Sequence, residues 1–208
     1  MKIALLFLVI SMNVPITHFA FADTCKFDLD TSSAKVTWTA FKTTQKVQVA
    51  GSFTSVDYSG SVSQQKSLNA LLKGIHAKIA VKDATSSTTG NPARDQTLFD
   101  HFFSKLAPNA VIEGKVKKIT GDDHEGTLDL GLVINRKSHV VSAHYILSPD
   151  GQLEAKASFD LLDFALSGPL DELHHACEAL HKGADGVSKT WSNIDIKFNA
   201  HVNQKCNP

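Results

Sequence analysis

Apolar and polar residues alternate at every second position along eight short stretches of the chain. In residues 34–41, for example, Val36, Trp38 and Ala40 alternate with polar side chains. A period of two, with turn residues between the stretches, is typical of antiparallel strands that bury one face. The eight predicted strands are residues 34–41, 46–53, 75–82, 110–119, 126–134, 139–147, 153–160 and 193–202. So many short strands in one chain predict an all-β sandwich or barrel.

Three segments interrupt the strands and have the composition of short helices. They are residues 67–73, 96–106 and 169–182. The last is the strongest, because Pro169 suits a first turn, Asp171 suits the positive end of the helix dipole, and Gly183 suits its end. We expect this helix to pack one apolar face on the barrel.

The first 22 residues predict a secretory signal peptide. Residues 3–10 are uniformly apolar, and residues 20–22 (Ala-Phe-Ala) form a small-x-small cleavage pattern. The apolar run is shorter than the roughly 20 residues that span a bilayer. We therefore expect export, cleavage after Ala22, and a single domain over residues 23–208.

Composition and motifs exclude several functional classes. The chain has 21 basic and 21 acidic residues, so it offers no electrostatic footprint for nucleic acid. It has no basic amphipathic stretch, so we expect no stable membrane insertion. It also has no Gly-x-Ser-x-Gly elbow, Gly-rich phosphate loop or His-Glu-x-x-His pair. The sequence therefore predicts a protein that is not an enzyme, and it leaves a homodimer open.

Three cysteines stand in a chain whose export would permit disulfides. In a closed barrel the first and last strands are neighbours, so Cys25 and Cys206 can meet, and we predict that they form a disulfide. Cys177 is then the odd thiol. In the alternative pairing, Cys177 bonds one of the two terminal cysteines and leaves the other free.

A block in the middle of the chain carries a family resemblance. From residue 77 to residue 116 an apolar strand leads into a Gly90-Asn91 loop. Then come the pair Arg94-Asp95, the pair Phe102-Phe103 and a second strand. This order resembles the YceI-like family, and the likeness extends over most of the mature chain, including residues 27–30, 51–53 and 126–141. The resemblance implies an antiparallel, eight-stranded, lipocalin-like β-barrel with a few short helices, located in the periplasm.

The resemblance also implies a ligand inside the barrel. Alternation alone fits a lumen filled by side chains, whereas YceI-like barrels hold polyisoprenoid tails or other long-chain amphiphiles. We expect no required cofactor, and a bound polyisoprenoid, quinone or fatty-amide-like lipid as the small-molecule partner. The expected wall residues are Trp38, Val49, Phe53, Ile79, Val81, Phe99, Phe102 and Phe103.

Two features near the barrel mouth bear on the head group of the ligand. Arg94 could contact a ligand head group, or Arg94 and Asp95 could form a local pair that pins the loop, with Asp95 as a helix N-cap. Relatives often carry an Arg before an Asp-aromatic-Gly turn. In residues 159–166, Leu162 and Ala165 occupy the Arg and Gly positions. A more apolar mouth favours a neutral or amide head group over a pyrophosphate.

The third predicted helix supports a different function. His174, Cys177, Glu178 and His181 are spaced so that one helical face could present all four. Two imidazoles, a thiolate and a carboxylate could bind zinc or copper. The alternative function is therefore a periplasmic metal-binding or redox protein, although the resemblance itself implies no metal here.

Overall fold

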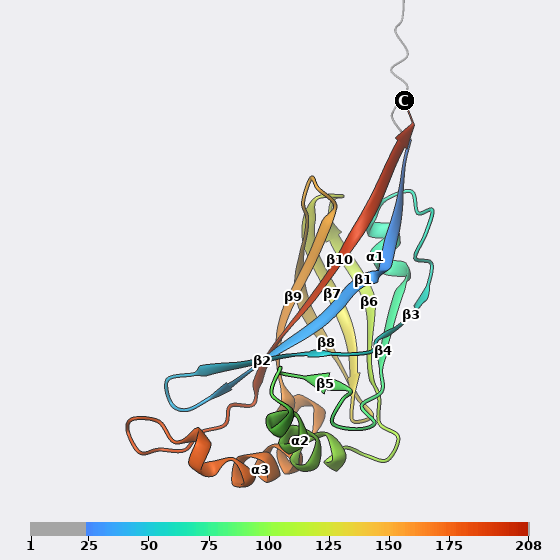
Figure 1. The fold of residues 1–208 in the computed structure, drawn as a ribbon. Coiled ribbons are helices and arrows are strands. Elements are labelled where there is room, and N and C mark those ends of the chain that lie inside the picture. The colour runs from blue at the N-terminus through green and yellow to red at the C-terminus, as the bar shows by residue number, and fades with distance from the viewer. Residues whose placement is uncertain (1–23, 208) are drawn as a thin grey trace, which may run out of the picture.

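The computed structural model describes residues 24–207 and shows one strongly curled antiparallel sheet with helices at its ends (Figure 1). The strands are β1 (Thr24–Lys42), β2 (Val47–Phe53), β3 (Asp57–Gly60), β4 (Ile75–Ile79), β5 (Ser87–Thr88), β6 (Ile112–Gly121), β7 (Glu125–Ile134), β8 (Lys137–Leu147), β9 (Gln152–Asp160) and β10 (Asn193–Asn207). The α-helices are α1 (Leu68–Gly74), α2 (Pro92–His101) and α3 (Ser167–Ala176). Three short 3-10 helices are η1 (Phe103–Lys105), η2 (Leu161–Phe164) and η3 (Glu178–His181). The predicted signal peptide, residues 1–22, lies outside the described residues.

The mostly-β antiparallel class is confirmed, but the eight-stranded closed barrel is wrong. The sheet has ten strands in the order β3-β4-β6-β7-β8-β9-β10-β1-β2-β5, with β3 and β5 at its edges. The chain bends between β2 and β3, and the two-residue β5 pairs only with β2, so no ladder joins the two edges. The curl still brings distant segments together, because Phe27 and Gln65 exchange backbone hydrogen bonds of 2.8 and 3.0 Å.

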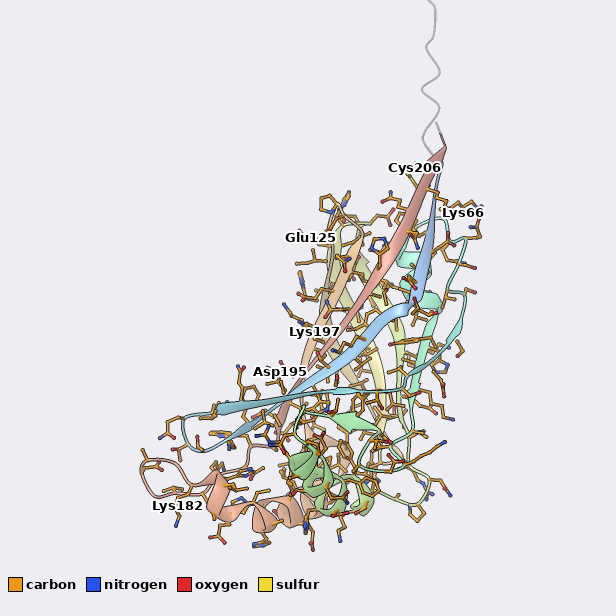
Figure 2. All side chains as sticks on the ribbon, in the orientation of Figure 1. Lys66, Glu125, Lys182, Asp195, Lys197 and Cys206 are labelled. Carbon is orange, nitrogen blue, oxygen red and sulfur yellow. A yellow bond between two sulfur atoms is a disulfide. The ribbon has the colours of Figure 1, made fainter. Side chains whose placement is uncertain are left out.

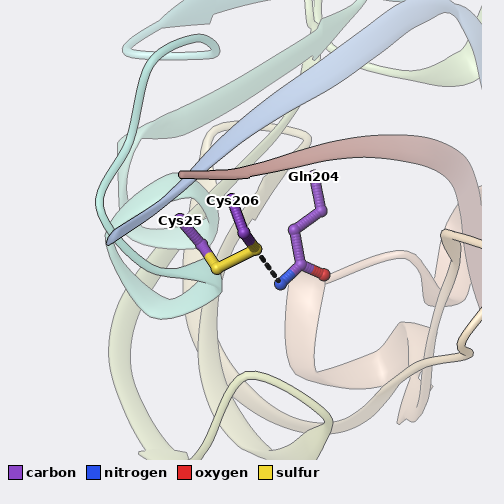
Figure 3. Close-up of a disulfide and its surroundings, with 3 residues drawn as sticks. All are labelled: Cys25, Gln204 and Cys206. Atoms are coloured by element: carbon purple, nitrogen blue, oxygen red, sulfur yellow. Dashed lines mark hydrogen bonds between the residues drawn. A yellow bond between two sulfur atoms is a disulfide. The ribbon is translucent and has the colours of Figure 1, made fainter. Parts of the chain in front are cut away.

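The longest ladder joins β1 to β10, and its ends carry the disulfide. Cys25 and Cys206 face each other in the register and form the predicted bridge (Figure 3). Cys177 is a buried free thiol, so the alternative pairing is wrong. The two strands extend together past the rest of the sheet, so the bridge sits at a tip of the molecule (Figure 1).

The end of the curl beside α1 is filled by tightly packed side chains. Ser67 caps α1 by accepting a hydrogen bond from the amide of Ala70 at 3.1 Å. The α1 leucines then pack into the end of the curl, and the side chains buried there are Phe27, Leu68, Leu71, Tyr145, Leu153 and Val202. This packing closes one end of the curl.

The other two helices lie at the opposite end of the curl and differ from the predicted ones (Figure 1). Helix α2 begins at Pro92, four residues before the predicted start, because Asn91 accepts a hydrogen bond from the amide of Arg94 and caps it. Helix α3 ends at Ala176, and the residues beyond Cys177 form the separate 3-10 helix η3. No helix among the described residues is long and apolar enough to cross a bilayer.

Candidate functional site

Two adjoining apolar cavities occupy the inside of the curl. The first has a volume of about 140 Å³, and the second, nearer α2 and α3, has a volume of about 110 Å³. Five side chains line both cavities: Phe53, Ile112, Ile134, Phe159 and Ile196. We call the two cavities together the lumen, since this common wall makes them neighbouring parts of one apolar space.

The first cavity exists because small residues pair with each other across two ladders and leave space on the inner face of the sheet. Ala77 pairs directly with Gly114 across β4 and β6, and Ala143 pairs directly with Ala157 across β8 and β9. All four line the cavity. Larger side chains at these positions would reach into the space. The cavity ends at Leu72, beside the packed α1 end.

The second cavity is framed by both tryptophans of the chain. The indole nitrogen of Trp38 donates a hydrogen bond of 2.9 Å to Ser87 Oγ, and that of Trp191 donates one of 2.7 Å to the carbonyl oxygen of Thr43. With their nitrogens satisfied, both rings offer apolar surface to the cavity. A Cβ at Gly51 would collide with the Trp38 ring, so Gly51 permits that ring position.

The paired phenylalanines after α2 close the wall between sheet and helices. The ring of Phe103 packs edge-on against Phe53, with centroids 6.3 Å apart, and Phe102 packs against Phe103 at 5.3 Å. All three line the second cavity. This segment therefore docks α2 on β2 through aromatic contacts.

Five of the predicted wall residues line the lumen and three do not. Those that line it are Trp38, Phe53, Ile79, Phe102 and Phe103. Val49 is paired with Ala40, and it lines neither cavity although Ala40 does. Val81 lies beyond the end of β4, and Phe99 lies next to the lining residue Leu98 on a different face of α2. Whether any of these side chains contacts a ligand stays a prediction.

The sequence prediction missed much of the wall that strands β6 to β10 provide. The apolar residues that these strands turn inward include Leu128, Leu132, Ala143, Ala157 and Phe198. Their alternation was visible in the sequence and could have identified them. On β10, Lys197, which is labelled in Figure 2, lies between inward-facing Ile196 and Phe198. Its side chain is 42% exposed and pairs with Glu154 at 3.6 Å.

Asp95 pins the loop at β5 to α2, but it is not the helix cap. Its carboxylate accepts hydrogen bonds from Thr88 Oγ1 at 2.9 Å, and from the Thr89 amide and hydroxyl at 2.7 Å each. Burial alone would raise the pKa of Asp95, but these hydrogen bonds hold that pKa below its ordinary value. Asn91 takes the cap position that one of the two interpretations gave to Asp95. Arg94 is exposed and lines neither cavity.

The predicted metal-binding face of a third helix does not form, because the α-helix ends before Cys177. His174 and His181 instead direct their Nδ1 atoms at the same hydroxyl, Thr190 Oγ1, at 3.0 and 2.6 Å. Within residues 24–207 no three His, Cys, Asp or Glu side chains are grouped to hold a metal ion. Burial raises the pKa of the Cys177 thiol. Burial, followed by the charges of Lys42 and His174, lowers the pKa of His181 to about 4.

Comparison with known proteins decides the family. The model of the YceI-like domain matches residues 27–202. The chain belongs to the YceI-like family. No curated protein sequence matches it.

Two solved structures share the fold of this YceI-like chain. One is a polyisoprenoid binding domain from Saccharophagus degradans, with a TM-score of 0.55 and 12% identity over 86% of this chain and 98% of that one. The other is BcnA from Burkholderia cenocepacia, with a TM-score of 0.53 and 16% identity over 85% of this chain and 99% of that one. At these identities the likeness shows the fold.

The turn after β9 carries Leu162 and Ala165, where we expected this YceI-like chain to differ from the family pattern. Ala165, expected at the Gly position, adopts a left-handed conformation with φ 56° and ψ 42°. That conformation favours glycine, because a Cβ crowds the following carbonyl oxygen. Leu162, at the Arg position, is 51% exposed. The turn therefore keeps the backbone shape that glycine suits while presenting an apolar side chain to solvent.

Proposed function

We propose that this protein binds the apolar tail of an isoprenoid or other long-chain amphiphilic lipid in its lumen and carries that lipid in the periplasm without transforming it. The observation that carries the proposal is the lumen itself, whose wall is formed by apolar side chains from most of the strands and from α2 and α3. The fold likeness to a polyisoprenoid binding domain supports the same class of ligand.

The energetics of burial favour such a ligand. Each methylene that leaves water contributes about 0.8 kcal/mol, so a five-carbon isoprene unit contributes about 4 kcal/mol before any costs. A few units outweigh the free energy lost in ordering ligand and protein, and micromolar or better affinity follows. No catalytic group is needed for this role.

The polar end of the lipid would lie away from the α1 end, because packed side chains fill that end. Helices α2 and α3 line the second cavity, which lies at the other end of the lumen. The exposed Leu162 beside the turn after β9 favours a neutral head group, such as a quinone or an amide. Contact between Arg94 and the head group stays a prediction.

Native mass spectrometry of the protein purified from an exporting host tests the proposal. We expect a bound mass that organic extraction releases and that fragments as a long-chain or isoprenoid lipid. Protein that carries no lipid, and that takes up neither a polyprenyl lipid nor a long-chain quinone when these are offered, would overturn the proposal.

A further inference from the structure

Two loops project together from the α2–α3 end of the molecule. They are residues 42–47, where β1 turns into β2, and residues 178–190, which run from η3 toward β10 (Figure 1). Thr44 Oγ1 in the first loop donates a hydrogen bond of 2.6 Å to Asp185 in the second, and a backbone hydrogen bond of 2.8 Å also joins the loops. We call these two connected loops the arm.

The arm exposes several large apolar side chains. Six such side chains are exposed within residues 24–207, and three of them are on the arm: Val47 at 47%, Leu180 at 70% and Val187 at 50%. Single exposed apolar side chains are normal on a soluble protein, whereas several on one projecting element indicate an interaction surface.

The arm is also basic. It has two acidic residues, Glu178 and Asp185, against four lysines, while the whole chain has 21 residues of each sign. The lysines are Lys42, Lys46, Lys182 and Lys189. The rest of the chain therefore carries an excess of acidic residues, including Asp171 and Glu172 on the neighbouring α3. A negatively charged surface would attract the arm and repel the remainder, so it would orient the molecule with the arm toward it.

Lysines interspersed with aliphatic side chains suit the surface of an anionic bilayer. The aliphatic groups enter the boundary between head groups and hydrocarbon, while the ammonium groups stay among the anionic head groups. A fluid surface adapts to side chains on a narrow arm, whereas a stable protein partner needs a broad matching surface. The base of the arm also adjoins the lumen, because Thr190 and the next residue, Trp191, line the second cavity.

We propose that the arm docks this protein reversibly on the surface of an anionic bilayer and brings the α2–α3 end of the lumen toward the membrane. The arm combines two segments that are remote in sequence, so no single basic amphipathic stretch is present. Docking of this kind inserts no helix. It also requires no ligand in the lumen, so the inference goes beyond the proposed function and is independent of it.

Sedimentation with vesicles tests this inference. The protein purified from an exporting host is mixed with vesicles of phosphatidylcholine alone, or of equal parts phosphatidylcholine and phosphatidylglycerol. We expect binding to the anionic vesicles, a steady loss of that binding as the salt concentration rises, and little binding to the neutral vesicles.

Two exposed side chains of the arm provide the variants. Leu180→Ser removes an apolar group and should lower the partition coefficient for anionic vesicles about tenfold. Lys182→Gln removes one charge and should lower it about fivefold.

The matched controls are Ile146→Ser and Lys66→Gln, which remove the same kinds of exposed side chain. Lys66 and Glu125 lie at the end of the molecule opposite to Lys182 (Figure 2), and Ile146 pairs with Glu125. Both controls should bind anionic vesicles like the wild type. Thermal unfolding verifies that all four variants are folded.

A wild-type protein that does not bind anionic vesicles would overturn the inference, even if the arm binds an acidic protein instead. Equal binding to both kinds of vesicle would also overturn it, as would equal losses for the arm variants and the controls. In each of these cases the proposed function stands, because the search for a bound lipid does not depend on the arm. A protein that docks on vesicles but carries and takes up no lipid would overturn the proposed function alone.

Discussion

Ala143 faces the lumen from β8, and its cross-strand partners there are Ala157 and Leu128. Ala143→Leu adds three carbon atoms that extend into the first cavity, where the small partner Ala157 leaves room. The added carbons exclude about three methylene groups of a tail, so binding should lose about 2.4 kcal/mol. That loss corresponds to a roughly 50-fold higher Kd in a lipid-binding titration.

The same substitution should act oppositely on the protein without lipid. The leucine carbons leave water on folding, so the free energy of unfolding should rise, by up to about 2 kcal/mol. His144→Leu is the control, because His144 is the next residue of β8 and is exposed. It should leave the Kd unchanged. If Ala143→Leu binds lipid like the wild type while remaining folded, the lumen is not where the tail lies.

Three further predictions concern stability. Ala165→Gly should raise the free energy of unfolding, measured by urea titration, by about 0.5–1 kcal/mol. The glycine removes the strain of a left-handed alanine, and the larger entropy of the unfolded glycine chain offsets part of that gain. A decrease would contradict the backbone geometry. Replacing Cys25 and Cys206 by serine should cost about 5 kcal/mol in the chain-entropy model, given their separation of 181 residues. A reductant should then destabilise only the wild type. His181 binds its proton more weakly in the folded state than in the unfolded state. Its contribution to the free energy of unfolding is therefore complete above about pH 6.5 and is lost as the pH falls through about 4. His181→Gln should flatten the pH dependence of unfolding over that range, and an unchanged slope would contradict the lowered pKa.

The sequence predicted strands well where one face is buried throughout. Predicted strands 126–134 and 153–160 lie within one residue of β7 and β9 at both ends. Strands β3 and β5 were missed because they are short and lack alternation, and pairing with β4 and β2 holds them in place. The break in the third helix was missed for a similar reason. Thr190, which is remote in sequence, draws together two histidines that a continuous helix would have kept in helical register.

The sequence predicted which face of each strand turns toward the lumen, but it did not predict that empty space would remain between the side chains. Alternation shows which side chains turn inward, and it led us to Trp38 and Phe53, whereas Phe103 was expected from the family resemblance. The space itself comes from alanines and a glycine that face each other across ladders, such as Ala77 and Gly114. Such pairing depends on strand register, and one residue of error in register inverts every assignment.

The disulfide at the tip of β1 and β10 has a topological consequence. Residues 25–206 form a covalent ring, because the backbone joins Cys25 to Cys206 in one direction and the sulfurs join them in the other. A single cut in any surface loop would therefore leave one connected molecule. A short peptide linker between the paired strand ends could replace the bridge, and the chain could then start in a different loop. The order of the strands along such a chain would depend on the loop in which the ring was cut, while the sheet itself would stay the same.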